Sequence, residues 1–193
     1  MPNLYIIAGC NGAGKTTASL SVLKEMLNCN EFVNADSIAA GLSPLNPESV
    51  AIEAGRLMLT RINKLINEKV DFAFETTLAT KSYQSLIKTA KNNDYQVWLL
   101  FFWLPNAEVA IARVASRVKN GGHFIPEEVI IRRYRRGIAN LVHIYCQLAD
   151  IWFVLDNSSL KPLLIAEGNG NVVIQVINQE LWLTINKISN EHR

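Results

Sequence analysis

The fold of this 193-residue chain is decided by the stretch Gly9-Cys10-Asn11-Gly12-Ala13-Gly14-Lys15-Thr16. The stretch fits the pattern G-x-x-x-x-G-K-[ST] at every position, an apolar run precedes it at 4–8, and a helix-compatible segment follows it at 15–28. Glycines let backbone N–H groups turn inward around a phosphate, and the helix presents its positive N-terminus to the anion. The pattern therefore predicts a loop that binds the phosphates of a nucleoside triphosphate.

Within this loop, Lys15 is expected to reach the β- and γ-phosphates, and the Thr16 hydroxyl is expected to be a ligand of Mg²⁺. ATP and Mg²⁺ are the cofactors that this chemistry predicts. The predicted nucleotide-binding residues are Gly9, Asn11, Gly12, Ala13, Gly14, Lys15, Thr16 and Thr17. Cys10 also lies in the loop, but its position alone does not make it a nucleophile.

Apolar, strand-like runs alternate with helical patterns along the whole chain. The strand-like runs are 4–8, 31–34, 70–75, 96–103, 151–155 and 172–177. The helical patterns are 15–28, 48–66, 83–92, 108–118, 126–148 and a tail that begins at 179. This alternation predicts an α/β fold of the three-layer P-loop NTPase type, with a mainly parallel five-stranded sheet and a helical lid. No linker-like composition divides the chain, so we expect a single domain over 1–193.

Composition and charge exclude several classes of protein. Hydrophobic residues make up 49% of the chain and charged residues 19%, which is unlike a disordered protein. A net charge of +2 does not favour a nucleic-acid binder. The longest apolar run, 97–104, is far shorter than the ~20 residues of a membrane helix, and the first residues lack the charged start of a signal peptide. Three widely spaced cysteines indicate reduced thiols, so we expect a cytoplasmic protein without membrane contact.

Two acidic residues follow predicted strands, where the ligand crevice of a parallel sheet lies. Asp36 would accept a proton from an acceptor hydroxyl or bind Mg²⁺, although Asp is also a common cap of a helix such as the one expected near Ser37. Glu75 would bind substrate hydroxyls or hold the water shell of the metal, although an acid also suits a helix N-terminus. Thr76, next to Glu75, is a further substrate-binding candidate.

Positive charge is concentrated between 108 and 136, a segment that contains seven basic residues and three acidic ones. Arg113 and Arg117 share one helix face, and Arg132 and Arg136 share another, because residues four apart are neighbours on a helix. The glycine pair at 121–122 separates the two helical patterns. This arrangement predicts a lid over about 113–136 whose guanidinium groups contact phosphates, with a solvated basic surface as the alternative. His123, which follows the glycines, is given no role as a base.

The motifs together resemble the zeta-toxin family over roughly residues 3–156. The resemblance rests on the phosphate loop, on Asn34-Ala35-Asp36, on Phe74-Glu75-Thr76-Thr77-Leu78, and on Gly121-Gly122-His123-Phe124-Ile125-Pro126 with Arg132-Arg133-Tyr134. It implies an ATP- and Mg²⁺-dependent kinase that phosphorylates a hydroxyl of the amino sugar of UDP-N-acetylglucosamine. A protein antitoxin is the further partner that the resemblance implies.

The resemblance also implies roles for individual residues. Asp36 matches the general base, and Glu75 matches an acid on the substrate side. Arg117, with Arg132 or Arg133, would act on the γ-phosphate, and Arg113 is a candidate for substrate binding.

The resulting expectation is a phosphotransferase that acts on a small-molecule hydroxyl. One alternative is a kinase that phosphorylates the 5′-hydroxyl of a polynucleotide, although the scattered basic residues outside the lid do not favour nucleic acid as a partner. The other is a nucleotide-dependent ATPase or switch that acts on a protein partner and has no acceptor.

Overall fold

One seven-stranded sheet forms the centre of the protein in a computed structural model that describes residues 1–21, 23, 27–119, 121–122 and 124–192. The strands are β1 (Asn3–Ala8), β2 (Glu31–Val33), β3 (Phe72–Thr76), β4 (Gln96–Trp103), β5 (Ile151–Asp156), β6 (Leu163–Asn169) and β7 (Val172–Val176). Their spatial order is β2-β3-β1-β4-β5-β6-β7. The first five strands pair in parallel, and β6 and β7 continue the sheet in antiparallel pairs.

The α/β fold is thus confirmed, but the predicted strand number of five is wrong. The parallel part has the expected five strands, and the additional two form an antiparallel extension. The sequence analysis did not identify β6 because Glu167, Gly168 and Asn169 interrupt its apolar pattern. Gly168 is required there, since a Cβ would collide with the Trp152 ring on the neighbouring strand.

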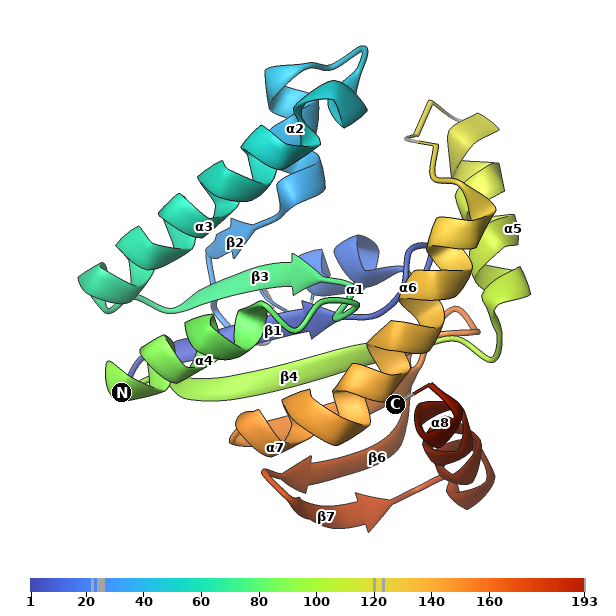
Figure 1. The fold of residues 1–193 in the computed structure, drawn as a ribbon. Coiled ribbons are helices and arrows are strands. Elements are labelled where there is room, and N and C mark those ends of the chain that lie inside the picture. Colours follow the sequence, from blue (N-terminus) through green and yellow to red (C-terminus); the bar gives the residue numbers. More distant parts are fainter. Residues whose placement is uncertain (22, 24–26, 120, 123, 193) are drawn as a thin grey trace.

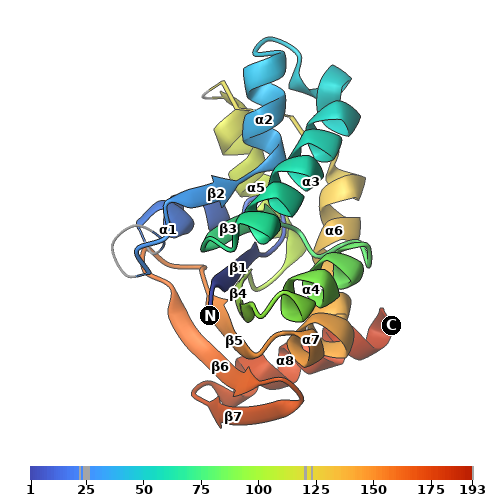
Figure 2. The same cartoon turned by 90° about the vertical axis from the view of Figure 1, so that its left-hand side faces the viewer.

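Helices cover both faces of the sheet. They are α1 (Lys15–Ser21), α2 (Ala35–Leu42), α3 (Ala51–Glu68), α4 (Tyr83–Asn92), α5 (Ala107–Lys119), α6 (Glu127–Asn140), α7 (Cys146–Leu148) and α8 (Gln179–Glu191), with a 3-10 turn η2 (Pro47–Val50) and a π-helical turn η3 (Leu141–Tyr145). Figures 1 and 2 show α1 on one face and α3, α4 and α7 on the other. The single helix predicted over 126–148 corresponds to α6, η3 and α7 in succession.

The core lies where these helices pack against the central strands. β1 and β4, which pair with strands on both sides, are almost fully buried, as continuous apolar runs in a parallel sheet should be. Trp103 and Trp152 are among the largest buried side chains, and Trp182 of α8 stacks on Trp152 with 5.8 Å between ring centroids. This stacking contributes to holding α8 against the antiparallel end of the sheet.

Strand register brings the ends of β1, β2 and β3 together. Ile7 lies opposite Glu75 in the β1–β3 pair, and Val33 lies opposite Phe74 in the β2–β3 pair. Because the strands are parallel, the segments that follow them emerge at one edge of the sheet. These segments are the phosphate loop, the start of α2 and the loop after β3.

Among the residues that the structure describes, no helix combines the length and the apolar character that crossing a membrane requires.

Candidate nucleotide and acceptor site

The loop between β1 and α1 has the geometry that its glycines predict. Gly12 and Gly14 both have φ of +77°, a conformation that L side chains rarely adopt. Packing adds a second constraint, because a Cβ on Gly12 would lie 2.6 Å from the Ala110 carbonyl oxygen, and one on Gly14 would lie 2.6 Å from Asn157 Nδ2. The loop is therefore held between α5 and the segment after β5, and no larger residue fits at these two positions without displacement.

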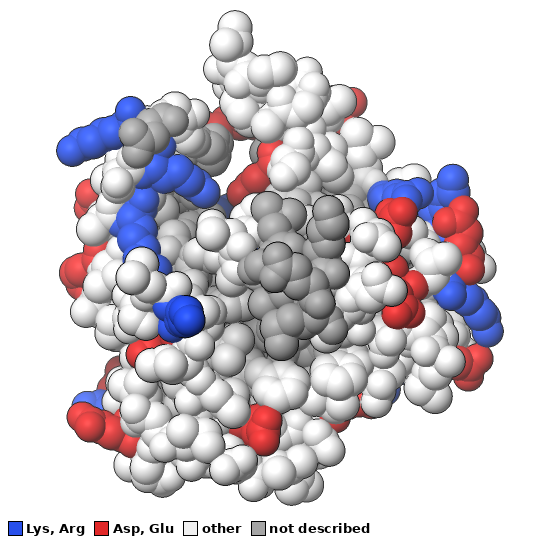
Figure 3. All heavy atoms as spheres, turned by 180° about the vertical axis from the view of Figure 1, so that it is seen from behind, with Lys and Arg blue, Asp and Glu red and all other residues white. Residues whose placement is uncertain are grey.

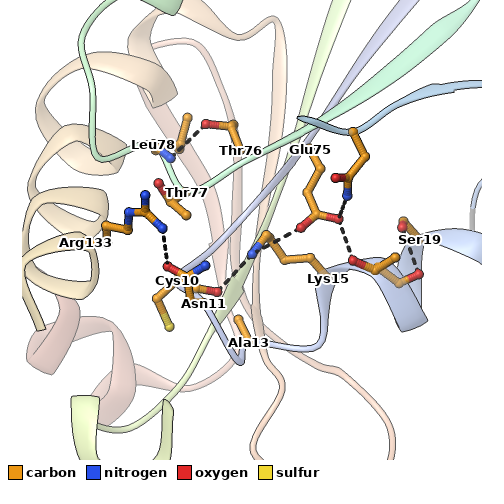
Figure 4. Close-up of polar contacts among 12 residues, drawn as sticks. Cys10, Asn11, Ala13, Lys15, Ser19, Glu75, Thr76, Thr77, Leu78 and Arg133 are labelled. Carbon is orange, nitrogen blue, oxygen red and sulfur yellow. Dashed lines mark hydrogen bonds and ion pairs between the residues drawn. The ribbon is translucent and has the colours of Figure 1, made fainter. Parts of the chain in front are cut away.

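Lys15, Thr16, Asn34 and Glu75 form one polar cluster at the end of the sheet (Figure 4). Glu75 Oε2 accepts hydrogen bonds from Thr16 Oγ1 at 2.7 Å and from Asn34 Nδ2 at 2.8 Å, and Lys15 Nζ lies 3.4 Å from Glu75 Oε1. Lys15 Nζ also donates to the Cys10 carbonyl at 2.9 Å. The ammonium group is buried and has both a charged and a neutral partner, so its desolvation is offset.

Asp36 lies in a pocket of about 790 Å³ between α2 and α6. Ala39, Pro44, Ile125 and Val129 supply apolar walls, and Arg132 and Arg133 supply the positive charge. Figure 1 shows α2 and α3 on one side of this region and α5 and α6 on the other. A carboxylate that faces two guanidinium groups in a pocket of this size is suited to bind a small polar molecule.

The structure shows that Asp36 is not the N-cap of α2, which was the alternative to a role at the ligand. The N-cap of α2 is Asn34, whose Oδ1 accepts from the Ser37 backbone N–H at 3.1 Å. Asp36 lies in the first turn of the helix, and its side chain is exposed to the pocket. The Asp36 carboxylate is therefore not needed as the cap and remains accessible to a ligand.

Arg133 connects this pocket with the phosphate loop. Its Nη1 donates to Asn11 Oδ1 at 3.0 Å, across 122 positions of the sequence (Figure 4). Burial lowers the pKa of the Arg133 guanidinium from its ordinary value, and the charge of Asp36 opposes that lowering. The guanidinium remains a cation at neutral pH because its ordinary pKa is so high. A single arginine thus contacts the nucleotide loop while it lines the pocket that contains Asp36.

Not all of the predicted lid arginines meet in this pocket. Arg113 of α5 instead donates from Nη1 to the Asn157 carbonyl and from Nη2 to the Ser158 carbonyl, both at 2.9 Å. These contacts hold the segment after β5, whose Asn157 side chain in turn donates to the Ala13 carbonyl of the phosphate loop. Arg117 lies near the end of α5 against Gly122 and does not line the pocket.

Thr76, also predicted to bind substrate, is buried, and its hydroxyl accepts from the Leu78 backbone N–H at 3.1 Å. His123 lies outside the described residues.

Helix α6 is fixed against the loop that follows β3. A Cβ on Gly137 would lie 2.6 Å from the Thr77 carbonyl oxygen, so the helix backbone directly contacts this loop. Asn140 Nδ2 donates to the Leu78 carbonyl at 2.7 Å, and Tyr145 Oη donates to the Thr80 carbonyl at 2.6 Å. The C-terminal end of the helix that carries Arg132 and Arg133 is therefore fixed against the loop after β3.

Two functional candidates were missed by the sequence analysis. Asn34 orients Glu75 and caps α2, and Asn157 packs against the phosphate loop. Asn34 had a local signal, because an Asn directly before a helix is a common N-cap that accepts from the backbone N–H two or three residues later. Asn157 had none, since its contact spans 144 positions.

The site is bordered by positive charge. Figure 3 shows Lys and Arg side chains gathered at the upper left, where α5 lies, with acidic side chains across a hollow beside them.

Burial raises the pKa of the Cys10 thiol to about 11. The Cys10 thiol is consequently protonated at neutral pH and a poor nucleophile. All three described cysteines are free and buried.

The model of the Zeta toxin family matches residues 1–160. The chain belongs to the Zeta toxin family. An uncharacterised protein of Haemophilus influenzae is 35% identical over 126 residues, which are 65% of this chain and 88% of that protein. The family match covers β1 to β5 with the whole of the cluster and pocket described above, and β6, β7 and α8 lie beyond it.

Solved structures share the fold of this zeta-toxin family member at low sequence identity. The AvrRxo1-ORF1:-ORF2 complex with ATP superimposes with a TM-score of 0.76 at 19% identity and covers 98% of this chain, which spans 64% of that chain. The PezAT toxin-antitoxin system of Streptococcus pneumoniae gives a TM-score of 0.68 at 16% identity, with coverage of 99% and 87%. These likenesses show that the chain shares the α/β fold of those proteins.

Proposed function

We propose that this zeta-toxin family member is a phosphotransferase that moves the γ-phosphoryl group of ATP to a hydroxyl of a small molecule. The observation that carries the proposal is the pocket that holds Asp36, Arg132 and Arg133 and is joined to the phosphate loop by the Arg133–Asn11 hydrogen bond. Phosphoryl transfer needs a base at the acceptor and cations at the transferred group, and both kinds of group are present. We propose one kinase domain over 1–193.

Asp36 is the proposed general base. Its carboxylate would accept the proton of the acceptor hydroxyl as the hydroxyl oxygen attacks the phosphorus atom. Lys15 would neutralise charge on the β- and γ-phosphates, for which it must exchange its present contacts with Glu75 and Cys10 for phosphate oxygens. Arg132 and Arg133 would contact the transferred phosphoryl group from the acceptor side, where their planar donors suit phosphate oxygens.

Mg²⁺ fits the cluster at the phosphate loop. The Thr16 hydroxyl and the Glu75 carboxylate are oxygen donors 2.7 Å apart, and oxygen donors are what Mg²⁺ prefers. Thr16 is the proposed direct ligand, and Glu75 would hold water of the metal or the acceptor. When bound, the ion would neutralise charge on the phosphates.

The remaining predicted residues have supporting roles. Arg113 would keep the segment after β5 against the nucleotide loop, and Thr76 would shape the loop after β3. A direct contact of either residue with substrate stays a prediction, as does a role of Arg117 at the γ-phosphate.

The amino sugar of UDP-N-acetylglucosamine is our leading acceptor. The resemblance of the motifs to zeta toxins favours it, and a pocket of about 790 Å³ is within the range for a small metabolite. The partially apolar walls would receive the sugar or base of this acceptor.

We further propose that the chain has a protein antitoxin as a partner and that it acts in the cytoplasm. The first proposal is supported by the PezAT toxin-antitoxin system, which shares the fold. The second is supported by the free state of the three cysteines, which is typical of a reducing compartment.

The experiment that tests the proposal measures ADP release from ATP and Mg²⁺ with and without UDP-N-acetylglucosamine. The wild type should be stimulated by the sugar nucleotide. Asp36→Asn should lose about 10²- to 10⁴-fold of this turnover, the usual contribution of a general base, and keep its affinity for ATP. Asp94→Asn is the matched control, because Asp94 pairs with Lys69 on the surface away from the pocket and has a positive φ that Asn tolerates.

If Asp36→Asn retains more than half of the turnover, the assignment of the base is wrong. If the sugar nucleotide has no effect on turnover but a 5′-hydroxyl oligonucleotide stimulates it, the acceptor is a polynucleotide and not UDP-N-acetylglucosamine. Turnover that is indifferent to both would support an ATPase.

A further inference from the structure

A second cavity lies at the C-terminal end of α6. It has a volume of about 700 Å³ and is enclosed by three parts of the chain: the loop after β3, the second half of α6 with η3, and the end of α8. Figures 1 and 2 both show the C-terminal end beside α6 and α7. The second cavity shares no lining residue with the pocket that holds Asp36.

The charged lining of the second cavity is entirely basic within the described part of the chain. Its side chains include Lys81 from the loop, Arg136 and His143 from the α6–η3 segment, and His192 from the end of α8, with no carboxylate among them. Lys81 and Arg136 take part in none of the ion pairs that the described residues form. The cations of Lys81 and Arg136, at a cavity whose described lining has no carboxylate, favour an anion as its ligand.

The helical repeat explains why these groups converge. Arg136, Asn140 and His143 are spaced by four and three positions, so they occupy one face of the continuous α6–η3 segment. The amide of Asn140 is fixed by its bond to the Leu78 carbonyl, and His143 Nε2 lies 3.2 Å from the Ser189 carbonyl. The wall of the second cavity is thus a rigid surface with oriented polar groups.

The chemistry of the lining points to a phosphate group. A guanidinium and an ammonium group favour a dianion with several oxygen acceptors. The Thr80 hydroxyl lies at the same wall, where it donates to Ser82 Oγ at 3.0 Å. Ala79, Ala139 and Ile144 leave apolar surface beside the charges, against which carbon atoms can pack. The volume is that of a small-molecule site and not of an extended polymer groove.

We propose that the second cavity binds the phosphate group of a small metabolite, at a site separate from those for the nucleotide and the acceptor. A shallow pocket whose lining includes Glu128, Arg132 and Arg136 connects the two larger ones, so the same helix face continues from one site to the other. Because α6 also holds Asn11 through Arg133, a ligand in the second cavity would stabilise the helix that contacts the nucleotide loop. The proposal does not depend on kinase activity.

The test measures phosphate binding by calorimetry in protein saturated with Mg²⁺ and a non-hydrolysable ATP analogue, so that the phosphate loop is already filled. Inorganic phosphate should bind in the second cavity. The double variant Lys81→Gln/Arg136→Gln should weaken this binding about tenfold or more, as expected for loss of two charge-assisted contacts. If Arg133→Gln abolishes the binding instead, the phosphate lies in the acceptor pocket and the proposal is overturned.

Lys88→Gln is the matched control, because Lys88 is an exposed lysine of α4 outside the cavity. If Lys88→Gln weakens phosphate binding as much as the double variant does, the attraction is a general surface effect and the proposal fails. It also fails if the double variant, with an unchanged thermal midpoint, binds phosphate like the wild type. Tighter binding of glycerol 3-phosphate than of phosphate assigns an organic ligand, whereas equal affinity assigns free phosphate, and either result supports the site.

Discussion

Replacing Asn34 should destabilise the protein more than replacing any exposed helix cap. Asn34 is 7% exposed and makes two hydrogen bonds, one from Nδ2 to the Glu75 carboxylate at 2.8 Å and one to Oδ1 from the Ser37 backbone N–H at 3.1 Å. Loss of a hydrogen bond to a charged group costs about 1.5–3 kcal/mol, and loss of an N-cap costs about 1 kcal/mol. Asn34→Ala should therefore lower the free energy of unfolding by about 3 kcal/mol.

Asn34→Ser separates the two contributions. A serine keeps the cap of α2 but is too short to reach Glu75, so we expect it to be about 1 kcal/mol more stable than Asn34→Ala. The matched control is Asn178→Ala, because Asn178 caps α8 in the same way, with Oδ1 accepting from the Leu181 N–H at 3.1 Å, but is exposed and has no carboxylate partner. That variant should lose only about 1 kcal/mol.

The assay is urea unfolding followed by circular dichroism, with one slope for all variants. Asn34→Ala and Asn178→Ala with equal losses would refute the reasoning, because the Glu75 bond would then contribute nothing. Equal stability of Asn34→Ser and Asn34→Ala would refute the role of Asn34 as the cap.

Three further outcomes follow from the geometry. Gly14→Ala should abolish binding of a fluorescent ATP analogue, since its φ of +77° and the 2.6 Å approach to Asn157 both exclude a Cβ; retained affinity would contradict this. Gly137→Ala should lower the thermal midpoint, because its Cβ would lie 2.6 Å from the Thr77 carbonyl oxygen. The expected cost is about 1–3 kcal/mol. An unchanged midpoint would show that α6 can shift freely. Cys10, with its pKa raised to about 11, should react with iodoacetamide at pH 8 about 100-fold more slowly than an ordinary thiol. Mass spectrometry of the labelled peptide measures the rate. Reaction at the rate of free cysteine would contradict the burial of Cys10.

The phosphate loop could be predicted from sequence because its constraints are local. Glycines at 9, 12 and 14 serve one turn, and the strand and helix on either side are adjacent in the chain. Asp36 was predicted at the ligand edge of the sheet and Arg132 and Arg133 in a basic lid, and all three line one pocket in the structure.

The remaining contacts depend on tertiary packing that no local pattern encodes. Arg113 was predicted for a substrate, yet in the structure its guanidinium holds the carbonyls of 157 and 158, because α5 packs beside the segment after β5. Of the two antiparallel strands, β7 matches the strand predicted over 172–177, whereas β6 was not predicted. Its pairing depends on β5 and β7 and not on a local apolar pattern.

The central claim is that Asp36 activates a hydroxyl that receives the γ-phosphoryl group of ATP. The most direct measurement follows the label of γ-³²P-ATP into UDP-N-acetylglucosamine, for the wild type and for Asp36→Asn at equal nucleotide occupancy. The account predicts labelled sugar nucleotide with the wild type and at least about 100-fold less with the variant. Label that leaves only as inorganic phosphate, at the same rate in both proteins, would contradict it.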